Sequence, residues 1–243
     1  MHLWYAMPAA ASDPGLLARY LALLQPEERD RHGKFTVERL RHEHLVARAL
    51  VRTVLSSYLP GAPAAWRFRP GPHGRPELDP PQPLRFNLSH SGDLAICAVS
   101  GGAEVGVDVE PYARAEKILG LAGRVLSDRE RTALPALGPE QALGRALTLW
   151  TLKEAYVKAL GIGISVPLRS LSFSVGDGPI GLESELAPDE GSRWCFEVVD
   201  LLSHRVAVAL AQPRGVLPKV RIWESAPLLR SVPASPAAAR LPR

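Results

Sequence analysis

Two long segments with apolar residues at helical spacing, one in each half of the chain, constrain the fold most. They cover residues 36–59 and 141–160. Leu59-Pro60-Gly61 ends the first helix, and Gly161-Ile162-Gly163 caps the second. Because short strand-like segments accompany each helix, we predict an α+β fold of two similar halves that meet near residues 100–105.

The predicted strands are short and alternate with turns. Residues 89–93 form a polar turn between the first two strands, and Pro111 closes the third. The predicted strands cover residues 84–87, 94–99, 104–110, 168–176, 193–199 and 204–211.

The chain is expected to divide into three parts: an N-terminal half (1–102), a C-terminal half (103–224) and a flexible tail (225–243). The tail contains four prolines, three arginines and no acidic residue. It therefore has no periodic apolar face to bury.

Composition excludes several classes of protein. Hydrophobic residues make up 46% and charged residues 22% of the 243 residues, as in ordinary globular proteins. No run approaches the roughly 18 apolar residues of a membrane span, and the start does not resemble a signal peptide. The net charge of +4 permits an anionic partner. The few aromatic residues do not interleave with Lys and Arg, so we expect no nucleic-acid partner.

The two cysteines, Cys97 and Cys195, lie inside apolar runs. Buried free thiols are the expected state, which fits a reducing compartment. We therefore predict a cytoplasmic protein without a membrane partner.

The first polar motif is Phe86-Asn87-Leu88-Ser89-His90-Ser91. A Ser-His-Ser turn could present a nucleophilic serine, but the sequence lacks the Gly-x-Ser-x-Gly elbow of many hydrolases. A hydrogen-bonded turn is the simpler interpretation of the motif taken alone.

The second motif, Gly106–Glu110, alternates as a strand, so Asp108 and Glu110 share one face. Two carboxylates so close repel each other unless a cation lies between them, and oxygen ligands favour a hard ion such as Mg²⁺. A solvated strand face is the alternative. Gly106 argues against it, because glycine inside a strand often marks the close approach of another group.

The third motif lies in the second helix, where Trp150, Glu154 and Lys158 form one stripe. A surface salt bridge between Glu154 and Lys158 is the alternative to a functional role. The first helix carries a basic stripe on its own surface, formed by Arg41, His44, Arg48 and Arg52.

Together these motifs resemble the signatures of the Sfp-type 4′-phosphopantetheinyl transferases, FN(L/I)SHS, G(I/V)D(I/V)E and WxxKEAxxKxxG, in the same order. Gly74-Arg75-Pro76 is similar to the family's G(K/R)P element, and residues 26–31 with the following helix resemble its N-terminal half. The resemblance covers about residues 20–210.

The resemblance implies a fold of two α+β halves related by pseudo-two-fold symmetry. It also implies an enzyme that moves the 4′-phosphopantetheine group of coenzyme A (CoA) to a serine of an acyl or peptidyl carrier protein. The other product is adenosine 3′,5′-bisphosphate. Because both halves of the site belong to one chain, we expect a monomer.

The resemblance further implies roles for the residues around the reacting phosphate. Asp108, Glu110 and Glu154 would hold Mg²⁺, or Mn²⁺ in its place. Glu154 would also take the proton of the carrier serine, directly or through a water. His90 and Lys158 would contact the pyrophosphate and complete the catalytic set.

The nucleotide of CoA would be bound by residues of the N-terminal half. Arg75 and Ser89 would contact the nucleotide, and Arg31 with Arg41 or His44 would contact the 3′-phosphate. Glu28 departs from the pattern, because some members carry a lysine there near this phosphate.

Two further regions have roles that the resemblance leaves open. Glu130 lies near an acidic position of the family whose role is uncertain. Residues 112–135 either pack as simple helices or form part of a dock for the carrier protein. The candidates for that dock are Arg114, Lys117, Ile118, Leu119 and Arg124.

Two other functions are alternatives. A non-catalytic module that binds CoA or a carrier protein could keep this fold, but it would have no reason to retain all three carboxylates and Lys158. A metal-dependent hydrolase of pyrophosphates would release free phosphopantetheine and would label no protein.

Overall fold

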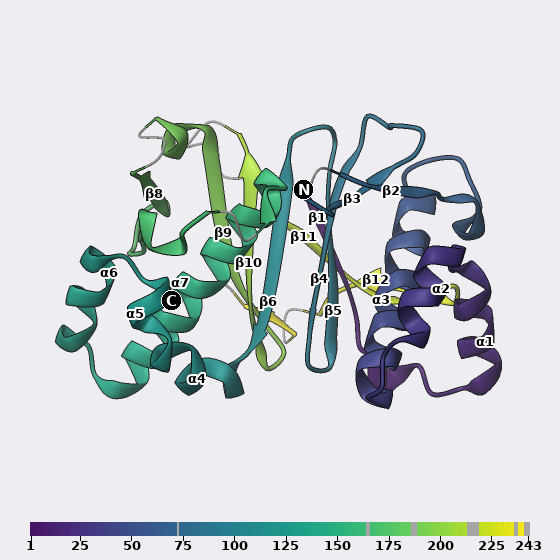
Figure 1. Cartoon of the computed structure of the whole chain (residues 1–243), viewed down its shortest axis with the longest axis horizontal. Helices are drawn as coiled ribbons and strands as arrows, with labels where there is room; N and C mark the ends of the chain where they lie inside the picture. The colour runs from purple at the N-terminus through teal and green to yellow at the C-terminus, as the bar shows by residue number, and fades with distance from the viewer. Residues whose placement is uncertain (72, 164–165, 186–188, 213–218, 236–237, 241–243) are drawn as a thin grey trace.

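The computed structural model describes residues 1–71, 73–163, 166–185, 189–212, 219–235 and 238–240 (Figure 1). Two sheets lie in the middle of the molecule, and helices cover the outer side of each (Figure 1). The order of layers is therefore helix, sheet, sheet, helix, and the predicted α+β class is confirmed.

The first sheet has five strands in the order β12-β11-β1-β5-β4, and β1 and β11 are parallel while the other pairs are antiparallel. The second has four antiparallel strands in the order β13-β9-β10-β6. Strands of the first sheet are β1 His2–Ala6, β4 Arg85–Ser91, β5 Leu94–Ser100, β11 Arg221–Ala226 and β12 Arg230–Pro233. Those of the second are β6 Val105–Pro111, β9 Trp194–Leu201, β10 His204–Ala211 and β13 Ala239–Arg240. Two small hairpins pair β2 Phe68–Pro70 with β3 Pro76–Leu78, and β7 Leu171–Ser174 with β8 Gly181–Ser184.

One long helix belongs to each half, as predicted. These are α3 Glu38–Ser56 and α7 Pro139–Leu160, and Gly161 ends α7 with a positive φ of 67°. The shorter helices are α1 Pro14–Leu23, α2 Pro26–Gly33, α4 Ala115–Gly120, α5 Ala122–Val125 and α6 Asp128–Ala133. None of the described helices combines the length and apolarity needed to cross a bilayer.

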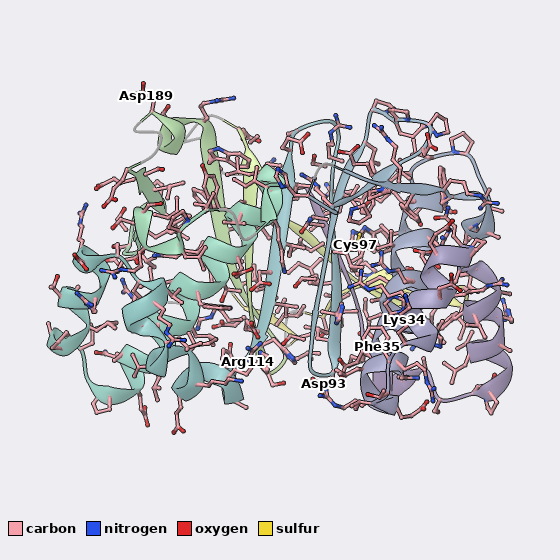
Figure 2. The ribbon with its side chains drawn as sticks, viewed as in Figure 1. Lys34, Phe35, Asp93, Cys97, Arg114 and Asp189 are labelled. Carbon is pink, nitrogen blue, oxygen red and sulfur yellow. The ribbon has the colours of Figure 1, made fainter. Side chains whose placement is uncertain are left out.

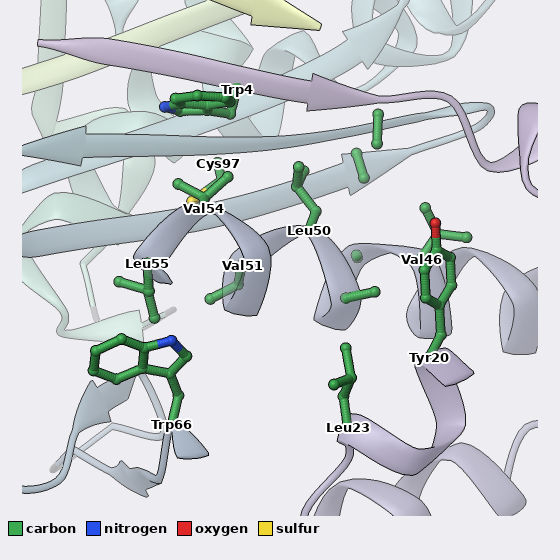
Figure 3. Packing of buried hydrophobic residues seen from close by; sticks show 14 of the residues in the cluster. Trp4, Tyr20, Leu23, Val46, Leu50, Val51, Val54, Leu55, Trp66 and Cys97 are labelled. Carbon is green, nitrogen blue, oxygen red and sulfur yellow. The ribbon is translucent and has the colours of Figure 1, made fainter. Parts of the chain in front are cut away.

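Strand alternation divides the apolar residues of the two sheets among three of the buried clusters formed by the described residues. In β1 and β5, Trp4 and Cys97 face α3 and pack against residues such as Val54 (Figure 3). Their neighbours Leu3 and Ile96 point the other way and pack between the two sheets. The outer face of the second sheet packs against α7 in the same manner.

The predicted polar turn at residues 89–93 is shorter in the structure. Strand β4 continues to Ser91, which pairs with Leu94 of β5, so only Gly92 and Asp93 form the turn. Ser89 and Ser91 do not break the strand, because their hydroxyls find hydrogen-bond partners on β6.

The prediction of a flexible tail from residue 225 is wrong for the described residues. Ser225 lies in β11 and is 4% exposed, and β12 pairs with β11. The Tyr20 hydroxyl donates to Pro227 O (2.8 Å), and Leu228 packs against the α3 core. The sequence did not indicate these two strands, because β11 and β12 bury side chains at only a few positions. Residues 236–237 and 241–243 of this segment lie outside the described residues.

Removing residues 227–243 should therefore destabilise the protein. The deletion removes β12 and the buried part of Leu228, which together contribute on the order of 2 kcal/mol or more. For a chain of this size we expect the melting temperature to fall by roughly 4–8 °C. Thermal unfolding followed by circular dichroism measures this, and an unchanged melting temperature would contradict the docking described above.

Candidate active site

The two sheets meet along β4 and β6, an edge strand of each. No backbone ladder joins these two strands, which belong to separate sheets. Alternate polar side chains of β4 bridge the edges instead, because they all point toward β6. The bonds run from Val107 N to Asn87 Oδ1 (3.0 Å), from Ser89 Oγ to Asp108 Oδ1 (3.1 Å) and from Ser91 Oγ to Glu110 Oε2 (3.0 Å).

Helix α7 lies directly on β6 because Gly106 has no side chain. A Cβ atom at this position would lie 2.0 Å from Ala155 O and 2.4 Å from Ala159 N. The predicted close approach at Gly106 is therefore confirmed. It brings the Glu154 and Lys158 stripe of α7 to the polar face of β6.

Asp108 lies at the centre of this contact. It is 4% exposed, and its Oδ1 atom accepts hydrogen bonds from Lys158 Nζ (2.5 Å) and Ser89 Oγ. Lys158 Nζ also donates to Ser89 Oγ (2.9 Å). The other carboxylate oxygen, Oδ2, is buried without a hydrogen-bond partner. A buried carboxylate oxygen in this state is costly unless a ligand or water satisfies it.

Glu110 is the most heavily bonded of the three carboxylates. Arg114 NH1 donates to both of its oxygens (2.8 and 2.6 Å), and Trp150 Nε1 donates to Oε1 (3.0 Å). With the bond from Ser91 it accepts four hydrogen bonds, about the number that a carboxylate can take. Arg114 lies at the same end of the molecule as Asp93 of the β4–β5 turn in Figure 2.

Glu154 completes the acidic group. Burial raises its pKa above the ordinary value, and the negative charge of Asp108, followed by that of Glu110, adds to the effect, while Lys158 opposes it. The pKa of Glu110 is raised by burial and by Asp108. The three carboxylates therefore share one electrostatic environment that has more negative charge than its cations offset.

A cation would relieve this excess of charge. Within the described residues, no three side chains of His, Cys, Asp or Glu are close enough together to hold a metal ion as they stand. The donors nevertheless suit Mg²⁺ in kind, because all are oxygens and Asp108 Oδ2 lacks a partner. Glu110 could join them only if one of its present donors withdrew.

His90 points to the other side of β4, toward α3. Although its side chain is largely exposed, partial desolvation and the positive charges of Arg48, Lys158 and Arg31 lower its pKa. His90 therefore feels the positive charges of Lys158, of Arg48 on α3 and of Arg31 on α2.

His44 is buried in that basic group. It is 3% exposed and its ring lies 5.2 Å from the ring of Phe35. Burial lowers its pKa to about 3, with Arg48 and Arg31 as the next causes. His44 is therefore neutral at pH 7, so the positive charge here comes from the arginines. Arg48 belongs to the predicted basic stripe, but no motif in the sequence marks it as a residue of the site.

Two of the arginines predicted to bind the nucleotide already have partners. Arg41 forms an ion pair with Glu38 on the surface of α3. Arg75 donates to Glu104 Oε2 (3.0 Å) and to three backbone carbonyls, including Ala159 O at the end of α7 (2.7 Å) and Val105 O (3.2 Å). Arg75 therefore braces the junction of the two halves, and its contact with a nucleotide stays a prediction.

Glu130 has a structural role that the sequence analysis missed. It is 5% exposed and forms an ion pair with Lys153 (2.6 Å), which is 0% exposed. Lys153 Nζ also donates to Val125 O, Leu168 O and Leu171 O at 2.8–2.9 Å. The only signal in the sequence was a lysine on the apolar side of the α7 pattern.

A cavity of about 310 Å³ opens beside Glu154 and Lys158, between the two halves. Its walls include Arg75 and Leu88 from the N-terminal half, and Glu154, Val157 and Lys158 from α7. Part of the wall is apolar and part is charged, which is typical of small-molecule sites.

Two family models match the chain. The one described as 4′-phosphopantetheinyl transferase superfamily matches residues 104–211. The one described as 4′-phosphopantetheinyl transferase, N-terminal, matches residues 12–101.

The curated relatives of this chain have the same description as the two family models. A 4′-phosphopantetheinyl transferase of Bacillus subtilis is 31% identical over 179 residues, which is 73% of this chain and 77% of the relative. The 4′-phosphopantetheinyl transferase HetI of Nostoc sp. is 33% identical over 168 residues, 68% of this chain and 70% of the relative. Among solved structures, holo-[acyl-carrier-protein] synthase of Neisseria meningitidis has a TM-score of 0.39 and 21% identity over 45% of this chain and 97% of that chain.

Gly106→Ala should displace α7 from β6. The new methyl group would overlap the backbone of α7, and overpacking of this kind typically costs roughly 1–3 kcal/mol. We expect the melting temperature to fall by about 3–10 °C and transfer activity to be largely lost, because Glu154 and Lys158 move with the helix. Gly144→Ala on α7 is the control, since a Cβ there meets no described atom within 4 Å apart from its chain neighbours and the helix's own backbone. Equal behaviour of the two variants would disprove the close approach.

Proposed function

Because the chain belongs to the 4′-phosphopantetheinyl transferase superfamily, we propose that it transfers the 4′-phosphopantetheine group of CoA to a serine of an acyl or peptidyl carrier protein. The observation that carries this proposal is the meeting of Asp108, Glu154 and Lys158 at the junction of the halves, beside a cavity. The chain would act as a monomer, since both halves of the site belong to it.

Asp108 and Glu154 would hold Mg²⁺, and Glu110 would join them after losing a donor such as Arg114. When bound, the ion would neutralise charge on the pyrophosphate of CoA. Asp108 Oδ2 supports this assignment, because it is buried and unpaired.

Lys158 and His90 would contact the pyrophosphate. Lys158 Nζ lies at the Ser89 and Asp108 end of the site, and His90 faces the arginines of the first half. Hydrogen-bond donors fixed in this way stabilise charge that develops on phosphate oxygens.

Glu154 would accept the proton of the carrier serine, directly or through a water. A carboxylate within reach of the serine hydroxyl, directly or through one water, would suit this role. The serine oxygen then bonds to the β-phosphorus, and the bond from that phosphorus to the bridging oxygen breaks. Adenosine 3′,5′-bisphosphate leaves with the electron pair.

The carrier protein would dock on residues 112–135. Lys117 and Arg124 are exposed, so two cations are available to an acidic partner, whereas Arg114 is partly exposed but pairs with Glu110. Ile118 is 2% exposed and packs in the protein, so this predicted dock residue cannot contact a partner.

The proposal is tested by incubating the protein with CoA, Mg²⁺ and a panel of apo-carrier proteins. A mass gain of one phosphopantetheine on the carrier supports it. A non-catalytic module would bind CoA without any mass gain, and a hydrolase would release free phosphopantetheine.

Glu154→Gln should abolish transfer and leave the fold intact. The variant lacks both a proposed metal ligand and the proposed base, so kcat should fall by at least about 100-fold. Glu140→Gln, at the exposed start of α7, is the matched control and should transfer normally. Activity of Glu154→Gln above about a tenth of wild type would exclude both roles.

Arg31→Ala should weaken the binding of CoA more than it slows the reaction. Arg31 is exposed on α2, and its charge acts on His44 and His90. A charge-assisted contact with phosphate contributes on the order of 1–3 kcal/mol, so the KM for CoA should rise roughly 5- to 150-fold. The change in kcat should be smaller, because the contact is remote from the reacting phosphorus. Steady-state kinetics measures both, and an unchanged KM would remove Arg31 from the site.

A further inference from the structure

The side chain of Arg114 occupies Glu110, one of the three carboxylates of the site. Arg114 NH1 donates to Glu110 Oε1 (2.8 Å) and to Oε2 (2.6 Å). Trp150 Nε1 also donates to Oε1, and Ser91 Oγ donates to Oε2. Because each carboxylate oxygen accepts about two hydrogen bonds, both oxygens of Glu110 are fully used. A metal ion can bind Glu110 only after one of these donors has left.

Of the three donors, Arg114 can leave at the least cost. Ser91 lies in β4, where it pairs with Leu94 of β5, and Trp150 lies in α7 and packs against apolar clusters of the second half. The side chain of Arg114 is 39% exposed, whereas that of Glu110 is 7% exposed. The guanidinium group can therefore move into water, and its long side chain allows this without a change in the backbone.

The contact of Arg114 with Glu110 is local in the chain. Arg114 ends the short 3₁₀ turn η3 Tyr112–Arg114, which directly follows β6, and its side chain reaches back four residues. Lys158 of α7 pairs with Asp108 on the same strand, so each carboxylate of β6 has an internal cation. The two pairs differ in one respect. Lys158 leaves Asp108 Oδ2 without a partner, whereas Arg114 bonds to both oxygens of Glu110.

We propose that Arg114 competes with the divalent cation for Glu110, and that an acidic side chain of the docked carrier protein draws Arg114 away and so strengthens metal binding. The proposal rests on the function proposed above. It adds to that function a link between docking of the carrier protein and completion of the metal site.

Charge complementarity identifies the kind of group that would draw Arg114 away. Arg114 belongs to the segment 112–135, which also presents the exposed cations Lys117 and Arg124. A partner that brings carboxylates to this segment is attracted by all three cations. Moving Arg114 from Glu110 to such a carboxylate replaces one ion pair with another, and it frees one acceptor position on each oxygen of Glu110. By linkage, the ion and the partner then strengthen each other's binding by the same factor.

Metal binding to the full chain, measured by calorimetry with Mg²⁺ and with Mn²⁺, tests the competition without turnover. Arg114→Met should bind either ion roughly 5- to 30-fold more tightly than wild type, because the ion no longer has to displace a charged donor. Lys117→Met removes an exposed cation from the same segment and is the matched control, and its affinity should stay within about twofold of wild type. Equal or weaker metal binding by Arg114→Met would overturn the proposal.

A change at Glu110 separates this competition from the general effect of removing a positive charge. In a Glu110→Gln background Arg114 has no carboxylate to occupy, so Arg114→Met should change ion affinity by less than about twofold. Paramagnetic resonance of Mn²⁺ extends the measurement to the weak binding expected here. A gain as large as in the wild-type background would mean that Arg114 acts through its charge alone, and the proposal would fail. If the background binds no ion, Glu110 is an indispensable ligand, and the comparison with Lys117→Met decides.

The stability of the variants is followed by thermal unfolding with and without Mg²⁺. Added Mg²⁺ should raise the melting temperature of Arg114→Met more than that of wild type, because tighter binding to the folded state stabilises it more. If Arg114→Met does not fold, Arg114→Ala replaces it. Failure of both variants to fold would assign Arg114 to stability and would overturn the proposal.

The link to docking is tested with a carrier protein that wild type labels, after its acceptor serine has been replaced by alanine so that no transfer occurs. This carrier should raise the Mg²⁺ affinity of wild type roughly 5- to 30-fold, and it should change that of Arg114→Met by less than about twofold. An equal effect on both proteins, or no effect on wild type, would show that the carrier does not act through Arg114.

The outcomes separate this proposal from the proposed function. If wild type labels no carrier protein, the transfer function and the link to docking fail together, and metal binding alone decides the competition for Glu110. If wild type labels carriers while Arg114→Met binds the ion no more tightly than wild type, the competition fails and the transfer function stands.

Discussion

The hydrogen bonds between the edge strands β4 and β6 are the contacts on which the site depends. Asn87, Ser89 and Ser91 connect two sheets that have no shared ladder, and two of the three bonds end on carboxylates of β6. The same bonds therefore join the halves and orient the acidic residues. This is the physical reason why an Asn-x-Ser-x-Ser strand and an Asp-x-Glu strand occur together in one sequence.

The opposite side of β4 serves a different purpose. Strand alternation sends His90 toward α3, whereas Ser89 on the next position faces Asp108. One strand thus separates a carboxylate-rich region from an arginine-rich region, and a ligand with several phosphates can span both. The absence of a side chain at Gly106 has a matching effect on the carboxylate face of β6, because it fixes the height of α7 above Asp108 and Glu110.

Much of this arrangement could be predicted from the sequence, because it depends on local periodicity. Helices α3 and α7, the alternation of Asp108 and Glu110, and the close approach at Gly106 all follow from spacing alone. Contacts between distant segments could not be predicted in the same way. The pairing of Glu130 with Lys153 and the placement of Arg48 depend on which helices meet, and β11 depends on a parallel partner more than two hundred residues away.

The position of β11 has a consequence for the order in which the protein is made. The first strand of the chain, β1, pairs with β5 early in the sequence, but its other edge is covered only by β11 near the C-terminus. During synthesis the N-terminal sheet therefore has an open edge while the whole second half emerges from the ribosome. The N-terminal half is completed last, after the half that follows it has been synthesised.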